Sequence, residues 1–332
     1  MSRQLRSTAK STPEPTTEDK QLPNKDIIPP LSFILSTTPP DITFDKSLPG
    51  LNHAELQTLQ KKKQQWLRNS ISATLETAHN EGPQATRALA ATLIFAQEEA
   101  GTGVCIDARG WILTCAHCFG ETPREWQAER RKWLLYYTGL AVQVECRVWD
   151  ARRDLALAKI IRVEMELPRH SDSSASGRTP LFSNVVPAKT QTPTAAVFCI
   201  GQPGADDLES SSPRKTAYDL IEVSTGRLRG LIPNADPQDN AEIGCLKHDA
   251  WTYWGHSGAP LLRQSDGAVL GLHSSWDDST AMRHGVPLVA IRAFLDENLD
   301  LDLSGSNGDL LVDSHSRSRP GHSEEAAIII ED

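Results

Sequence analysis

Residues from about 87 to 290 are divided into short apolar runs by turn signals, and this pattern limits the possible folds more than any other feature. The runs include GVCIDARGWILTCA, LALAKIIRV, AAVFCI and GAVLGLHSS. Tight turns are indicated at Asp107-Ala108-Arg109-Gly110 and at Asp266-Gly267. Many short strands at this spacing are typical of barrels or of a sandwich, so we expect an all-β domain.

The two ends of the chain differ from this region in composition. Residues 1–50 are rich in proline, serine and threonine, whereas residues 301–332 are polar and acidic. Neither segment offers enough apolar surface to offset the entropy of ordering it, so both are predicted to be disordered. Asn52 and Glu55 form a capping-box signature, and apolar residues then repeat at helical spacing, which predicts a helix within 51–82.

The all-β domain is therefore assigned to residues 85–300. Within this domain, residues 169–194 contain many serine, threonine and proline residues. This composition predicts a loop that links the two halves of the domain. The segment AIRAFLDENL predicts a closing helix near 290–299.

Bulk properties exclude several classes of function. The formal net charge is -9, which argues against an unaided nucleic-acid surface because phosphates are neutralised by clustered Lys and Arg. We find neither a secretory leader nor an apolar run long enough to span a bilayer. Without a leader, the six cysteines are expected to be reduced thiols, and the expected location is cytosolic or nuclear.

Three local patterns carry residues suited to nucleophilic catalysis. His117 follows an apolar run in TCAHC, Asp154 leads directly into LALAKI, and Ser257 lies in GHSGAP. Serine is a weak nucleophile at neutral pH, so it needs a nearby base, and that base needs a carboxylate to orient it. The three residues supply these roles in the chain order His, Asp, Ser.

With these motifs the chain resembles the trypsin-like serine protease superfamily, in particular its HtrA-like branch without a PDZ domain. The resemblance covers 85–300, in the order GTGVCIDARGWILTCAHC, DLALAKI, CIGQPG, VSTGRLRGLI, WGHSGAPLL, GLHSSW and HGVPLVAIRAFL. It implies two six-stranded antiparallel β-barrels, here with an N-terminal helix, a C-terminal helix and disordered termini. It also implies a serine endopeptidase that acts on proteins or peptides and needs no metal or organic cofactor.

Roles for individual residues follow from their matching positions. The resemblance implies that Ser257 attacks the scissile carbonyl, that His117 takes and returns the proton, and that Asp154 orients the imidazole. The N–H groups of Gly255 and Ser257 would form the oxyanion hole. Ser274 matches the position that supports the buried Asp.

The substrate pocket is expected to involve Trp251, Thr252, His273 and Ser274. The resemblance implies that Trp251, six residues before the nucleophile, occupies the position where trypsin carries a carboxylate that selects basic side chains. An indole there disfavours a basic side chain and suggests a neutral group before the scissile bond. Trp251 is equally consistent with a residue that only covers the loop.

Other interpretations use the same residues. Gly255–Ala259 approximates the nucleophile elbow of α/β-hydrolases, but HDAWTYW before it is no buried strand. A metal site at Cys115, His117 and Cys118 lacks a second Cys/His pair at zinc-finger spacing. The alternative to an enzyme is a catalytically silent trypsin-like fold that acts as a protein-binding scaffold.

The acidic C-terminal tail contains two short aliphatic runs edged by acids. Both resemble SUMO-interacting motifs, which add a strand to a sheet edge of the modifier. The alternative is that Ile328–Ile330 fold back as an edge strand on the protein's own barrel or form a solvated end. The residues concerned are Leu310, Leu311, Val312, Ile328, Ile329 and Ile330.

Overall fold

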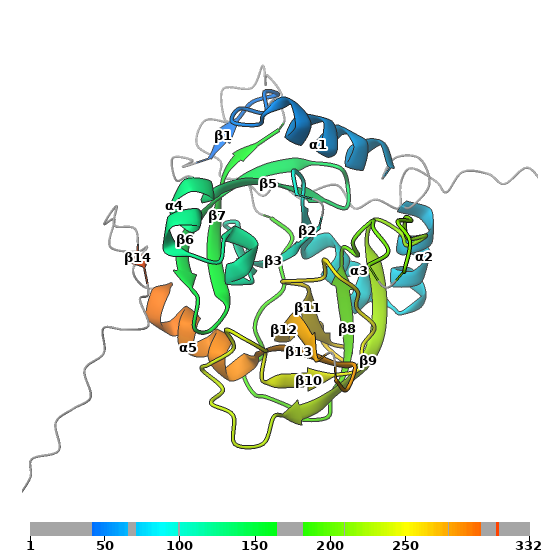
Figure 1. Ribbon diagram of the computed structural model, residues 1–332, viewed down its shortest axis with the longest axis vertical. Helices are drawn as coiled ribbons and strands as arrows, with labels where there is room; N and C mark the ends of the chain where they lie inside the picture. The colour runs from blue at the N-terminus through cyan, green and yellow to red at the C-terminus, as the bar shows by residue number, and fades with distance from the viewer. Residues whose placement is uncertain are drawn as a thin grey trace, which may run out of the picture. The chain divides into compact units, whose positions relative to one another are not determined.

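Two closed antiparallel barrels of six strands each make up the all-β region, as predicted (Figure 1). The structure is a computed structural model, and it describes residues 42–65, 71–98, 100–164, 182–208, 210–277, 279–299 and 310–311.

The first barrel has the strand order β7-β4-β3-β2-β5-β6 and is closed by pairing of β6 with β7. Its interior is lined by buried side chains such as Leu93, Ile112 and Val144. The turn at Asp107–Gly110 joins β3 to β4, as predicted. The strands are β2 (Thr92–Phe95), β3 (Thr102–Asp107), β4 (Trp111–Thr114), β5 (Arg131–Tyr136), β6 (Ala141–Asp150) and β7 (Leu155–Val163).

Two short strands extend this sheet from the ends of the chain. β1 (Thr43–Phe44) pairs in parallel with β7, and β14 (Leu310–Leu311) pairs in parallel with β6. The prediction of disorder is therefore wrong for these residues, because backbone pairing to an existing sheet does not need the apolar composition on which the prediction relied. The rest of 1–41 and of 301–332 lies outside the described residues.

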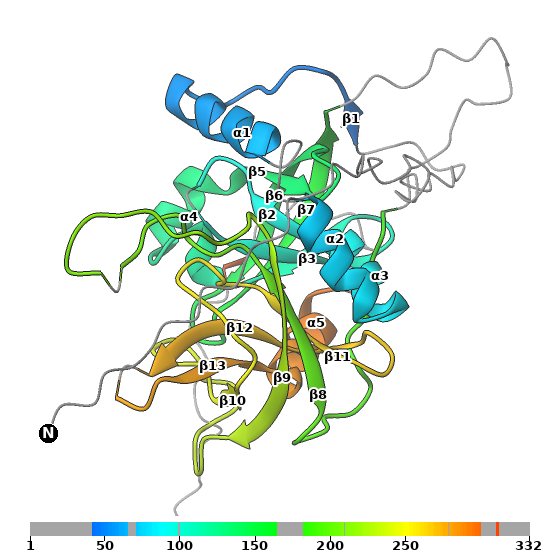
Figure 2. The ribbon, with the colours of Figure 1, turned by 90° about the vertical axis from the view of Figure 1, so that its right-hand side faces the viewer.

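The second barrel has the strand order β10-β13-β12-β11-β8-β9 and is closed by pairing of β9 with β10. Figure 2 shows it below the first barrel. The turn around Asp266-Gly267 joins β11 to β12, as predicted. The strands are β8 (Ala196–Gly201), β9 (Glu222–Leu231), β10 (Leu246–His248), β11 (Pro260–Arg263), β12 (Val269–Asp277) and β13 (Met282–Pro287).

The N-terminal helical region differs from the single helix predicted over 51–82. It contains α1 (His53–Gln65) and α2 (Ile71–Asn80), and residues 66–70 between them lie outside the described residues. The predicted capping box is confirmed, because the Glu55 N–H donates to Asn52 Oδ1 at 3.0 Å and the Asn52 N–H donates to Glu55 Oε2 at 2.7 Å.

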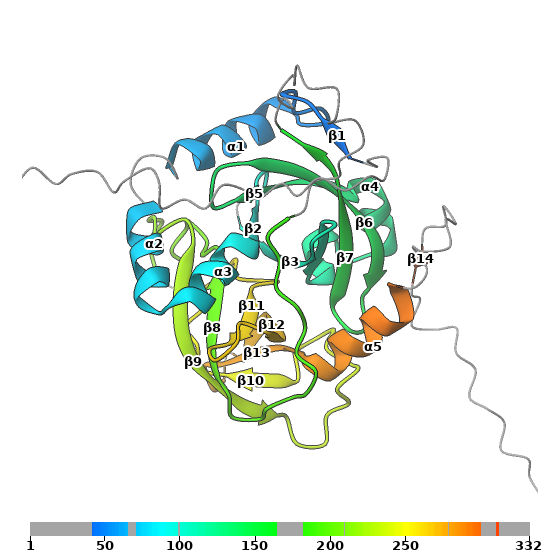
Figure 3. The same cartoon turned by 180° about the vertical axis from the view of Figure 1, so that it is seen from behind.

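A further helix, α3 (Pro83–Ala91), covers the start of LAATLIFA (residues 89–96), one of the short apolar runs from which strands are predicted. Proline suits the first turn of a helix, where an N–H has no intrahelical partner. Figure 3 shows α2 and α3 beside β8 and β9. α4 (Pro123–Glu129) lies between β4 and β5, and α5 (Leu288–Asn298) confirms the predicted closing helix.

A shared core fixes the two barrels against each other. One hydrophobic cluster includes Val104 from the first barrel, Phe198 and Leu272 from the second, Leu89 from α3 and Phe294 from α5. Because these side chains are buried together, residues on loops of the two barrels are held at a constant separation. Within the described part of the chain, no helix is long and apolar enough to cross a membrane.

Candidate active site

His117 is held by the turn that follows β4. The strand ends at Thr114, and residues Ala116–Phe119 then form one turn of 3-10 helix, η3. Ala116 and Phe119 are buried, and Trp149 Nε1 donates a hydrogen bond of 2.9 Å to the Ala116 carbonyl. These contacts fix the backbone on both sides of the imidazole.

Asp154 is the hydrogen-bond partner of this imidazole. It is buried, and it lies just before β7 with a φ of 52°, a conformation that few non-glycine residues adopt. Its Oδ1 accepts from His117 Nδ1 at 2.9 Å and from the His117 N–H at 3.2 Å, while its Oδ2 accepts from Ser274 Oγ at 2.6 Å. Ser274 thus supports the carboxylate, as the resemblance implied.

The pairing sets the tautomer and the basicity of His117. Burial lowers the pKa of His117, but the charge of Asp154 and its hydrogen bond raise it more, so the net shift is upward from 6.5. When the neutral ring donates from Nδ1 to Asp154, its Nε2 carries the lone pair. The imidazole is therefore oriented to accept a proton at Nε2.

Ser257 lies in the turn between β10 and β11, where the two barrels meet. Its carbonyl accepts from the Thr102 N–H of the first barrel at 2.9 Å. The next N–H, of Gly258, donates to the His273 carbonyl of β12 at 2.9 Å. Gly258 has a φ of 80°, and a Cβ there would lie 2.1 Å from the Thr102 carbonyl oxygen. Only glycine allows the loop to approach the first barrel this closely.

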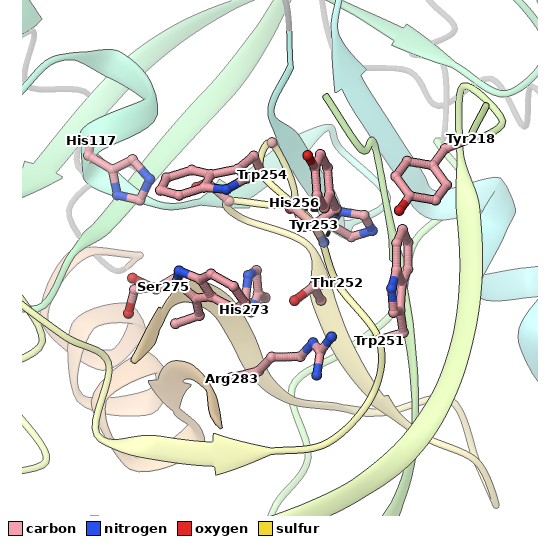
Figure 4. A pocket seen from close by; sticks show the side chains of 14 residues that line it. His117, Tyr218, Trp251, Thr252, Tyr253, Trp254, His256, His273, Ser275 and Arg283 are labelled. Carbon is pink, nitrogen blue, oxygen red and sulfur yellow. Dashed lines mark hydrogen bonds between the residues drawn. The ribbon is translucent and has the colours of Figure 1, made fainter. Parts of the chain in front are cut away.

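One cavity of about 540 Å³ brings the predicted residues together. His117, Ser257 and Gly255 lie in its wall, and so do all four predicted pocket residues, while Asp154 lies behind His117. Figure 4 shows this cavity with His117 at one end and Trp251 at the other. Its described lining is completed by Tyr218, Tyr253, Trp254, His256, Ser275, Trp276 and Arg283.

Two details of the nucleophile loop bear on its chemistry. No hydrogen bond joins Ser257 Oγ to His117 Nε2 among the bonds between described residues. Such a bond is often long before substrate binds. Gly255 has a φ of 100°, and a Cβ there would lie 2.3 Å from Ala100 Cβ. Glycine is thus required beside the nucleophile.

A metal site is the other chemistry these residues suggest. Donor atoms of Cys115, His117 and Asp154 lie within 4.8 Å of one another. However, Asp154 and His117 already bond each other, and the Cys115 thiol donates to the His273 carbonyl at 3.4 Å. Hydrogen bonding therefore accounts for the cluster without an ion. All six cysteines are free, as expected.

Sequence reasoning missed Arg283 and Trp276, which pair across β12 and β13. They lie on the second and third strands after the nucleophile loop, and nothing in the local sequence distinguishes them from their neighbours on those strands. The structure places the backbone of Leu310 and Leu311 on the edge of the first barrel. Val312 and Ile328–Ile330 lie outside the described residues, so modifier binding stays a prediction.

Comparisons with known proteins place this arrangement in a family. One similar solved structure is an inactive serine-to-alanine mutant of Rv3671c from M. tuberculosis, with 15% identity and a TM-score of 0.45, and the match covers 68% of this chain and 93% of that one. Another is the serine endoprotease from Yersinia pestis, with 18% identity and a TM-score of 0.44, and the match covers 68% of this chain and 67% of that one. No curated protein matches the chain. The model of the trypsin-like peptidase domain matches residues 101–272, a span that contains His117, Asp154 and Ser257. The chain therefore belongs to the trypsin-like peptidase domain family.

Proposed function

We propose that this protein is a serine endopeptidase that hydrolyses peptide bonds through His117, Asp154 and Ser257. The observation that carries the proposal is the 2.9 Å hydrogen bond from His117 to the buried carboxylate of Asp154, at the edge of the cavity that Ser257 lines. This pair supplies an oriented base, and the neighbouring serine supplies a nucleophile.

The reaction proceeds by acyl transfer. Ser257 Oγ attacks the carbonyl carbon of the scissile bond while His117 Nε2 takes its proton. The N–H groups of Gly255 and Ser257 stabilise the oxyanion, and loss of one such donor costs about 3 kcal/mol in comparable sites. His117 then protonates the leaving amine. Water, activated by the same base, hydrolyses the acyl-serine ester, so that the acid product leaves and Ser257 regains its proton.

A fluorophosphonate probe tests this proposal directly, because it phosphonylates an activated serine and needs no knowledge of the substrate. We expect the purified protein to be labelled at Ser257. The variant Ser257→Ala should not be labelled. The control is Ser224→Ala, which removes the hydroxyl of a serine outside the triad, one that is hydrogen-bonded to the Trp251 carbonyl at 2.7 Å, and this variant should still be labelled. A folded wild-type protein that resists the probe would favour the scaffold alternative.

The rate of labelling should depend on pH through His117. Because the pKa of His117 is raised above 6.5, the protonated form persists to higher pH than in a free histidine. Only neutral imidazole accepts the serine proton, so the rate should be low under acidic conditions and rise as pH passes the raised pKa. Labelling rates measured from pH 5 to 9 give this profile directly, and a flat profile would contradict the role of His117.

We also propose that the enzyme works in the cytosol or nucleus. The six free thiols support this location, because disulfides are rare in reducing compartments. Fractionation of cells that express the tagged full chain tests it. Recovery from the medium would contradict it.

A further inference from the structure

Arg283 provides a positive charge in the wall of the cavity beside Ser257. Its Nε is buried without a hydrogen-bond partner, and its guanidinium has no ion pair or hydrogen bond within the described part of the chain. None of the described residues that line the cavity is acidic. The side chain as a whole is half-buried, and a charge partly withdrawn from water without a counter-ion favours a ligand that brings a negative charge.

A second unpartnered donor lies beside it. Trp276 on β12 is the cross-strand partner of Arg283 on β13, and residues opposite each other in an antiparallel pair project from the same face. Trp276 Nε1 is also buried without a hydrogen-bond partner. The two strands thus present two N–H donors and no compensating acceptor, which matches the needs of a carboxylate.

The histidines around Arg283 do not share its charge. Burial lowers the pKa of His248 and of His256 to about 3, and it lowers the pKa of His273 well below the usual value. The His273 ring is held by a 3.1 Å hydrogen bond between its Nδ1 and Nε2 of His248. Neutral rings neither repel Arg283 nor compete with it, so the guanidinium sets the electrostatic character of this part of the cavity.

The cavity wall at the Trp251 end is aromatic. Trp251 and Tyr218 meet edge to face with ring centroids 4.8 Å apart, and Trp251 stacks on Tyr253 at 6.4 Å. Figure 4 shows the guanidinium of Arg283 near Thr252, between His273 and Trp251. Apolar walls keep water away from the charge and strengthen its attraction for a carboxylate. They also pack against the methylene groups that carry an acidic side chain.

We infer that the cavity selects substrates with an acidic residue, aspartate or glutamate, immediately before the scissile bond, and that Arg283 is the residue that determines this specificity. The inference rests on the proposed function, because it assigns the substrate class of the same site. A basic side chain there meets a like charge, and a neutral one leaves the half-buried guanidinium without a counter-ion. This preference for an acidic residue differs from the sequence-based expectation, in which Trp251 alone suggested a neutral group before the scissile bond.

Matched peptides test the inference with the full chain. We would compare peptides that carry glutamate or glutamine, and aspartate or asparagine, before the scissile bond, since each pair differs in charge but hardly in size. For at least one pair, the acidic peptide should have a kcat/KM at least about 100-fold higher, because a buried polar site strongly rejects an analogue that leaves its groups unpaired.

Variants then assign the preference to Arg283. The change Arg283→Gln should reduce the acidic-to-amide ratio to below about tenfold, and Arg283→Glu should shift the preference toward lysine. The change Arg131→Gln, at an arginine with a 60% exposed side chain on β5, should leave the ratio unchanged. Probe labelling of each variant shows whether it is folded with a reactive serine.

The outcomes separate this inference from the proposed function. A wild-type protein that is labelled by the probe but cleaves neutral or basic peptides best overturns the inference and leaves the endopeptidase in place. Retention of the acidic preference in a labelled Arg283→Gln protein overturns the assignment to Arg283. A wild-type protein that neither reacts with the probe nor cleaves any peptide of the panel overturns both.

Discussion

Replacing Asp154 by asparagine is expected to lower kcat by about 10⁴-fold, the loss seen when the orienting carboxylate of such a triad is removed. The physical reason is the tautomer of His117. An asparagine amide that donates to Nδ1 forces the ring proton onto Nε2, the atom that must accept the serine proton, and it no longer stabilises the imidazolium. Single-turnover hydrolysis of the best peptide, compared between the two proteins, measures the loss.

Two further measurements show whether Asp154 acts through His117. Its charge raises the pKa of His117, so the asparagine variant should titrate this histidine at lower pH, as followed by NMR of labelled imidazole. The control is Asp236→Asn, at an exposed aspartate paired with Arg152 at 2.7 Å, which should change neither the rate nor the titration. Activity of the Asp154 variant within tenfold of wild type would remove this residue from the mechanism.

Replacing Gly258 by alanine is expected to destabilise the protein and disable Ser257 together. The new Cβ would lie 2.1 Å from the Thr102 carbonyl oxygen and 2.3 Å from Thr114 Oγ1, in a backbone with a φ of 80°. The free energy of unfolding should fall by about 2–5 kcal/mol, because overpacking costs about 1–3 kcal/mol and the left-handed conformation about 1–2 kcal/mol. Chemical denaturation measures this change, and probe labelling measures the displacement of the serine.

Gly230 provides the matched control for this prediction. It also has a φ of 80°, but a Cβ there would meet nothing within 4 Å. Gly230→Ala therefore carries the conformational cost without the clash, and it should lose only about 1–2 kcal/mol of stability with normal labelling. Equal losses in the two variants would show that the contact between the nucleophile loop and the first barrel contributes little.

The sequence by itself predicted the two barrels, through the family resemblance, and it singled out the three residues of the proposed triad. Their local patterns are short and specific: an apolar strand before His117, a strand directly after Asp154, and glycines on both sides of Ser257. Apolar runs divided by turn residues likewise reveal antiparallel strands, because both pleat and turn are local properties of the backbone. Family membership followed from their order along the chain.

Local patterns failed where pairing with a distant segment decides the structure. Thr43–Phe44 and Leu310–Leu311 are strands only because β7 extends past its neighbour β4, and β6 past β5, so that the ends of both strands have backbone groups left to pair. The helix α3 covers the start of a run that reads as a strand, since an apolar run has no period that separates the two structures.

Only the tertiary structure brought Arg283 to the cavity. The sequence between Ser257 and Arg283 gives no sign that this arginine, rather than its neighbours, faces the site. A single-residue change in register would turn its side chain to the other face. The pairing of Trp276 with Arg283 sets that register, and closure of the second barrel places both beside Ser257. The residues of the proposed triad can therefore be recognised in the local sequence, whereas the position of the charge that we propose selects the substrate depends on strand register and barrel closure.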